Sequence, residues 1–154
     1  MTSDFCIALH ALVFLDHKAC AVSSVQLADN ICTNAARVRK VMAPLRNAGF
    51  VETSEGLGGG YKITADPAKI SLAKIAQTLN TKFVEMNWYS GNPEKDCLVS
   101  SGMGAIMDGI LNDLDNVCIA HLKNTTVADV SNKIFSKKKN PPRTERKRKT
   151  YERI

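Results

Sequence analysis

Residues 33–64, TNAARVRKVMAPLRNAGFVETSEGLGGGYKIT, contain the pattern that decides the fold. Apolar residues in the first half of this stretch recur at steps of three and four residues, which predicts an amphipathic helix. The helix is expected to begin at Thr33 or Asn34 and to end at Gly49, a residue type that often terminates helices. Its inward face is predicted to consist of Val38, Val41, Met42 and Leu45.

A β-hairpin is predicted directly after this helix. Residues 50–53 and residues 61–64 each alternate between apolar and polar side chains, as half-buried strands do. The glycine-rich segment 56–60 between them predicts a tight turn, because glycine readily adopts the left-handed conformations that such turns use. A helix followed by such a hairpin is typical of a winged helix.

Two further helices are predicted on the N-terminal side of this stretch. The apolar residues of segment 3–17 follow a helical period, and Ser23 or Ser24 is expected to cap a second helix that continues to Ile31. Three short helices with a short connection between the last two predict a helix-turn-helix. The fold class is therefore mainly α with a small β-hairpin, and residues 1–66 are expected to form a winged helix-turn-helix domain that binds DNA.

A connecting region is expected at residues 67–100. Ser71 is in position to cap a helix that runs to Leu79, and residues 81–100 are interpreted as a loop.

A long helix is predicted from about Gly102 to Lys123, where apolar residues again recur at steps of three and four. A helix of about 22 residues is about 33 Å long, and its apolar face is larger than so small a domain can cover. We therefore expect residues 101–135 to form a dimerisation helix and a C-terminal segment, within a homodimer. The alternative is a helix that packs only on its own domain.

The chain of 154 residues has room for one domain with appendages. It contains no run of 18 apolar residues that would span a membrane. Its first residues include an acidic Asp4 where a signal peptide needs positive charge, so a cytoplasmic location is expected.

The net charge of +6 is concentrated at the C-terminus. Residues 137–154 contain nine Lys or Arg and two Glu, a net charge of +7, whereas the other 136 residues carry −1. Residues 136–154 are therefore predicted to be a disordered basic tail. DNA binding by the folded part must depend on local patches.

Several segments of the chain together resemble the Rrf2 family of bacterial winged-helix transcription regulators. They are SDFCIALHAL (3–12), LA (27–28), VRKVM (38–42), LRNAGFV (45–51), GGY (59–61) and ISL (70–72). The resemblance covers about residues 2–80, and the long helix is in the family's place. It implies a homodimeric repressor or activator that binds double-stranded DNA at a partly palindromic operator. It also implies that a signal is received near the loop before the dimerisation helix.

Candidate DNA-binding residues lie on the predicted third helix and the hairpin. Thr33, Asn34 and Arg37 are expected to meet base edges, since Asn and Arg can bind adenine and guanine through two hydrogen bonds. Arg39, Lys40 and Arg46 suit phosphates. Gly58 and Gly59 could approach the backbone closely, although Glu55 beside them would repel it. The alternative is a solvated basic face.

The five cysteines are odd in number and widely spaced, which fits neither a disulfide framework nor a zinc finger. Family members with an iron–sulfur cluster hold it with three cysteines before the long helix, whereas this loop has only Cys97, so no cofactor and no metal site are expected. Cys32, placed just before the third helix, and Cys97 are instead candidate redox-sensing thiols. The resemblance brings the Cys97 loop close to a DNA-binding domain, so a Cys32–Cys97 disulfide within or between subunits is conceivable. The alternative is a buried Cys32 and a merely exposed Cys97.

The predicted function is a sequence-specific regulator, in the first instance a repressor. Alternatives are a regulator that senses an iron–sulfur cluster or a small ligand, and a nonspecific DNA-binding or protein-interaction module acting through the tail. No set of nucleophile, base and carboxylate suggests an active site, so no enzyme is expected.

Overall fold

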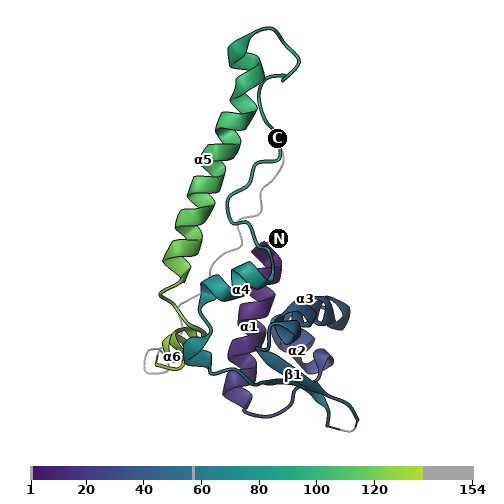
Figure 1. The fold of residues 1–154 in the computed structure, drawn as a ribbon. Coiled ribbons are helices and arrows are strands. Elements are labelled where there is room, and N and C mark those ends of the chain that lie inside the picture. Colours follow the sequence, from purple (N-terminus) through teal and green to yellow (C-terminus); the bar gives the residue numbers. More distant parts are fainter. Residues whose placement is uncertain (1, 57, 137–154) are drawn as a thin grey trace, which may run out of the picture.

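The computed structural model describes residues 2–56 and 58–136 and contains a winged helix-turn-helix from which one long helix projects (Figure 1). The elements occur in this order: α1 (Thr2–Lys18), α2 (Ser24–Ile31), α3 (Ala35–Asn47), β1 (Val51–Ser54), β2 (Gly60–Ile63), a short 3-10 turn η1 (Pro67–Lys69), α4 (Leu72–Thr78), α5 (Leu98–Leu122) and α6 (Val127–Ser136). The predicted fold class, mainly α with a small β-hairpin, is confirmed.

Hydroxyl and amide side chains begin three of the helices, as the sequence indicates. Ser23 caps α2 in a reciprocal capping box with Gln26. Asn34 caps α3, and Ser71 caps α4 by accepting a hydrogen bond from the Lys74 N–H at 3.2 Å. Each such cap typically contributes about 1 kcal/mol, because it satisfies a backbone donor that the helix leaves unpaired.

The hairpin pairs β1 with β2 in antiparallel register, with Val51 opposite Ile63 and Ser54 opposite Gly60. Each strand is offset by one residue from its predicted position, β1 later and β2 earlier. β2 begins at Gly60 because this residue pairs with Ser54, and a separate backbone bridge joins Tyr61 to Val22 in the segment before α2. A Cβ at Gly60 would collide with the Val22 carbonyl, so this approach requires glycine.

The core surrounds α1, which contacts α2, α3, α4, α6 and β2. The largest side chains in this core that solvent does not reach are Leu12, Leu15, Leu27, Met42, Leu45, Ile70 and Ile75. Cys6 of α1 does not belong to this core and is exposed.

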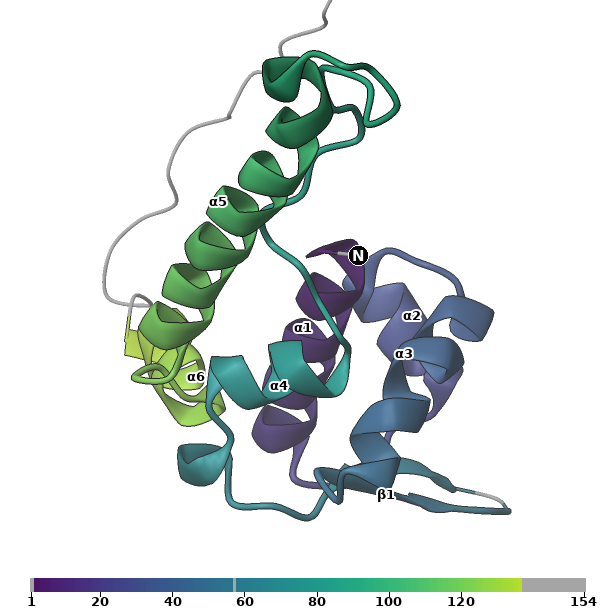
Figure 2. The ribbon, with the colours of Figure 1, turned by 45° about the horizontal axis from the view of Figure 1, so that its top comes forward.

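Helix α5 projects from this core (Figures 1 and 2) and begins at Leu98, earlier than the predicted Gly102. Of its 25 residues, Leu111 is the only buried one. The loop between α4 and α5 runs along the helix and returns at its far end.

Helix α6 was predicted only as a C-terminal segment and packs against α1. Val127 is fully buried, and the ring of His17 stacks on Phe135 at 4.3 Å. Backbone hydrogen bonds join Val127 N–H to the Ile70 carbonyl and Leu72 N–H to the Thr125 carbonyl. After α5 the chain therefore returns to the core and packs α6 against α1.

Within residues 2–56 and 58–136, no helix is long and apolar enough to cross a membrane. Ser136, predicted as the first residue of the basic tail, is instead the last residue of α6, and residues 137–154 lie outside the described residues.

Candidate nucleic-acid interface

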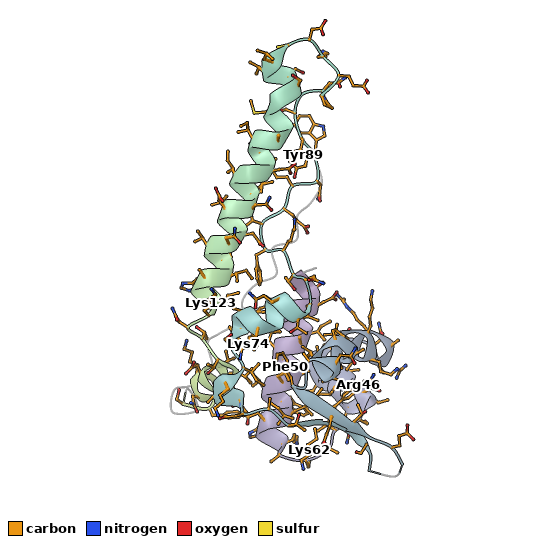
Figure 3. The ribbon with its side chains drawn as sticks, viewed as in Figure 1. Arg46, Phe50, Lys62, Lys74, Tyr89 and Lys123 are labelled. Carbon is orange, nitrogen blue, oxygen red and sulfur yellow. The ribbon has the colours of Figure 1, made fainter. Side chains whose placement is uncertain are left out.

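The third helix, α3, has one buried and one exposed face, as the periodicity predicts. Its buried residues are Val38, Val41, Met42 and Leu45. Asn34, Arg39, Lys40 and Arg46 are exposed, whereas Thr33 and Arg37 are half-buried. Figure 3 shows Arg46 extending from α3 at the surface. The three phosphate-binding candidates thus lie on the exposed face of α3, whereas Asn34 is the one exposed base-reading candidate.

Arg37 differs from its prediction. Its Nη2 donates to Ser3 Oγ at 2.7 Å and to Asp4 Oδ1 at 3.1 Å, both in the first turn of α1. The two partners of this ion pair are only 39% and 27% exposed. The Arg37 guanidinium is therefore held against α1 in this structure, because acceptors more than thirty positions earlier in the chain lie beside it. Its predicted contact with a base edge would require these bonds to be exchanged.

Asn34 and Thr33 lie at the start of α3. The Asn34 Oδ1 accepts a hydrogen bond from the Arg37 N–H at 2.8 Å, so the carbonyl half of the amide is already used as the helix cap. A two-bond contact with adenine needs both halves of the amide. Asn34 can thus offer its amide N–H groups to a base while it caps the helix. The Thr33 N–H donates to the Ala28 carbonyl, which holds the turn between α2 and α3.

The phosphate-binding candidates differ in how they are held. Arg39 Nη1 donates to Ser24 Oγ at 3.1 Å, which places a cation beside the first residue of α2. For the side chains of Lys40 and Arg46, no hydrogen bond or ion pair is found among the described parts of the chain. These two cations are therefore available to a phosphate without breaking a contact.

The wing is less basic than the helix. Gly58 is exposed, and Gly59 cannot carry a side chain because a Cβ there would collide with the Ser54 carbonyl. Glu52 stands opposite Lys62 in the hairpin, and Glu55 is exposed near the tip. The carboxylates oppose approach to phosphates, so α3 carries the more favourable charge.

Cys32 lies at a different helix terminus from the one expected. It is the C-cap of α2, in the left-handed conformation with φ of 60°, and precedes the Asn34 cap of α3. Cys32 thus forms the C-terminus of α2, not the N-terminus of α3. Its side chain is exposed, so the alternative of a buried residue is also wrong.

Cys97 is an exposed thiol at the N-cap of α5. The start of α5 lies at the far end of the projection from α2 and α3 (Figure 1). One protomer in this arrangement therefore does not bring Cys32 and Cys97 together.

The described residues do not fit an iron–sulfur cluster. Cys97 is the single cysteine of the loop before α5, and no three His, Cys, Asp or Glu side chains of residues 2–56 and 58–136 are grouped as a metal site. Since a cluster is held by about four ligands, this donor set does not provide for one within a protomer.

The loop before α5 is attached to that helix by groups that sequence reasoning missed. Asp115 Oδ1 accepts hydrogen bonds from the N–H groups of Phe83 at 2.7 Å and Val84 at 3.2 Å. Tyr89, a residue of this loop, lies beside α5 (Figure 3), and its hydrogen bond to Asp108 is the main cause that raises its pKa above 10.0. In the sequence, these two sites could have been suspected from the spacing of Asp108 and Asp115, which lie two helical turns apart on an otherwise apolar helix.

Comparison with known proteins defines the class and then the family. The fold and the basic helix define a winged-helix DNA-binding protein. Residues 1–133 match the Rrf2 family, described as an iron-dependent transcriptional regulator, so the chain belongs to the Rrf2 family. It is a DNA-binding transcription regulator and not an enzyme.

Three similar proteins agree with this assignment. A Bacillus subtilis protein named as an HTH-type transcriptional regulator, YwnA, is 26% identical over 137 residues, which cover 88% of this chain and 99% of YwnA. A Lactobacillus plantarum structure described as a transcriptional regulator has a TM-score of 0.78 at 20% identity and covers 88% of this chain and 91% of its own. CymR, the global cysteine regulator of B. subtilis, has a TM-score of 0.59 at 20% identity, covering 86% and 96% of the two chains.

Proposed function

We infer that this chain is a homodimeric repressor that binds a partly palindromic DNA site and responds to oxidation of its thiols. The observation that carries the homodimer is the uncovered apolar face of α5. Leu98, Val99, Ile106, Ile110, Leu114 and Val117 are between 46% and 87% exposed. Burial of each such side chain is worth about 1.5–3 kcal/mol, which a second copy of the same helix would provide through a twofold axis.

The DNA contacts are proposed to centre on α3. Thr33 and Asn34 meet base edges, and Arg39, Lys40 and Arg46 neutralise phosphates. The wing glycines Gly58 and Gly59 make a smaller contribution, since carboxylates flank them. A dimer carries two such helices, so its operator has two half-sites related by the same twofold axis.

The binding experiment selects fragments of the source genome with the full chain and then measures affinity for the selected and a scrambled duplex. We expect a large preference for the selected duplex, and loss of that preference in a Thr33→Ala, Asn34→Ala double variant. Equal affinity for both duplexes would favour the alternative function, a nonspecific module acting through the tail, because charge-driven binding is indifferent to sequence.

The thiol response is proposed to join Cys32 of one subunit to Cys97 of the other. Both side chains are exposed, and the position of Cys97 at the far end of α5 favours a bond between subunits over one within a subunit. Hydrogen peroxide would accept two electrons and the two thiol protons, leaving one S–S bond and two water molecules. The bond would shift the turn that precedes α3 and so lower DNA affinity.

Peroxide treatment followed by non-reducing electrophoresis tests this proposal. We expect a band of dimer mass that disappears in Cys32→Ser and in Cys97→Ser and persists in Cys20→Ser. A chain that stays at monomer mass and keeps its DNA affinity after peroxide would end the redox proposal, while the DNA-binding proposal would stand.

A further inference from the structure

The first turn of α1 contacts two separate parts of the molecule. On one side, Ser3 and Asp4 accept hydrogen bonds from Arg37 of the recognition helix α3, at 2.7 and 3.1 Å. On the other side, the ring of Phe5 meets the ring of Phe83 edge to face, with centroids 5.1 Å apart. Phe83 belongs to the loop that follows α4, so three consecutive residues of α1 touch both the recognition helix and this loop.

The loop is in turn attached to α5 at the same residue. The N–H groups of Phe83 and Val84 both donate to Asp115, so one carboxylate satisfies two adjacent backbone donors that no helix or strand pairs. Asp115 and Phe83 are half-buried, and Phe5 is 9% exposed. We call the five residues Asp115, Phe83, Phe5, Asp4 and Arg37 the clamp. Its contacts join α5 to α3 without interruption.

Other contacts between the loop and α5 do not reach the recognition helix. Asn92 N–H donates to the carbonyl and hydroxyl oxygens of Ser100, both at 3.0 Å, near the far end of α5. Tyr89 and Asp108 join the loop to the middle of the helix. These pairs hold the loop to the projection, whereas Asp115 lies nearer the end of α5 from which the chain turns back to α6.

We propose that the clamp sets the angle between α5 and the recognition helix, and thereby the spacing between operator half-sites that the dimer accepts. The inference rests on the proposed DNA-binding homodimer. Arg37 and Asp115 are then positioning residues: Arg37 holds α3 against α1, and Asp115 holds the loop that bears on Phe5. In a twofold dimer, the orientation of α3 relative to the dimerisation helix determines the distance between the two recognition helices.

When two α5 helices pack together, each winged domain is attached at the base of its own α5. A pivot of the domain about that base moves α3 relative to the twofold axis. Adjacent base pairs are only ~3.4 Å apart, so a small pivot changes the half-site separation that the dimer fits. A dimer with a loosened clamp would therefore tolerate half-sites that are displaced by one or two base pairs.

The test compares Asp115→Ala with Asp115→Asn in the full chain, on duplexes whose half-site separation differs from the selected operator by zero, one or two base pairs. Asparagine keeps an acceptor oxygen for the two N–H groups, whereas alanine removes it. Asp113→Ala is the matched control, because this carboxylate on the same helix is exposed and, among the described residues, no hydrogen bond or ion pair is found for it.

For wild type, Asp115→Asn and Asp113→Ala, we expect affinity to fall at least about tenfold when the separation changes by one base pair, as for a mismatched site. For Asp115→Ala the fall should be less than about threefold, while its affinity for a duplex with a single half-site stays that of wild type. Asp4→Ala, at the other end of the clamp, should broaden the accepted spacing in the same way, and it supplies the test if Asp115→Ala does not fold.

The inference, but not the proposed function, would be overturned if the wild type prefers the selected duplex and both alanine variants keep the wild-type preference for half-site separation. A wild type that does not distinguish the selected duplex from random DNA would overturn the proposed function, and the inference with it. A single half-site affinity that drops in Asp115→Ala as much as the full-site affinity would also contradict a positioning role.

Discussion

The winged domain and helix α5 contain similar proportions of apolar residues but place them in opposite ways. In α1 the large apolar residues Leu12 and Leu15 are buried within the chain, at 0% and 1% exposure. In α5 the comparable residues Ile106 and Leu114 remain 63% and 49% exposed. The periodicity of an amphipathic helix thus shows that a face is to be covered, but not whether its cover comes from the same chain or from another.

The largest expected effect is on the folding of the winged domain. Leu12→Ala removes a fully buried side chain from the helix that contacts most other elements. The free energy of unfolding, measured in urea, should fall by about 2–5 kcal/mol, as for other buried leucines. A loss below about 1 kcal/mol would mean that α1 is not the centre of this core.

Leu114→Glu tests the uncovered apolar face of α5 rather than the buried core of the winged domain. A carboxylate on the uncovered face of α5 should leave the fold of the winged domain intact, since Leu114 is half exposed in one chain. It should shift sedimentation at micromolar concentration from dimer to monomer, because a buried charge in the interface is costly. Asp113→Glu is the control on the same helix. A variant that remains dimeric would place the interface elsewhere.

Lys40→Ala tests the charge on the exposed face of α3. Removing one phosphate contact should weaken DNA binding and reduce the slope of log affinity against log salt by about 0.9. The preference for the operator over random DNA should change little, because phosphate contacts carry no direct sequence information. Lys74→Ala, a cation on α4, should leave affinity and slope unchanged, and an equal effect there would argue against α3 as the contact surface.

The smallest effect concerns the start of α6. The backbone N–H and then the hydroxyl of Thr126 donate to Asp129 and lower the pKa of its carboxyl below 3.8. A carboxylate with a lowered pKa in the folded state stabilises the fold above its unfolded pKa, and this contribution disappears as pH falls through the folded value. Asp129→Ala should therefore cost stability at pH 7 and little at pH 2. A cost independent of pH would mean that packing, not charge, matters there.

The parts of this fold that depend on local chemistry could be predicted from the sequence. The caps at Ser23, Asn34 and Ser71 and the buried face of α3 follow from residue type and spacing over a few positions. The Val22–Tyr61 bridge, a contact between segments far apart in the chain, does not follow from such local patterns.

The candidate site was harder to predict for the same reason. Arg37 and Lys40 lie close together on α3, but acceptors in the first turn of α1 bind the Arg37 guanidinium, and their position cannot be read from the sequence around α3. The sequence position of Cys32 just before α3 suggests that it belongs to the start of that helix, whereas in the structure it is the C-cap of α2. Asp115 acts on a loop more than thirty positions away, which periodicity does not report.

The most direct test of the account titrates the full chain into the selected palindromic duplex and a scrambled duplex at two salt concentrations, with mass measured by sedimentation. We expect two chains on each selected duplex and a preference of at least about 1,000-fold that persists at the higher salt. Equal affinities that fall together as salt rises would contradict it, because binding would then depend on charge alone.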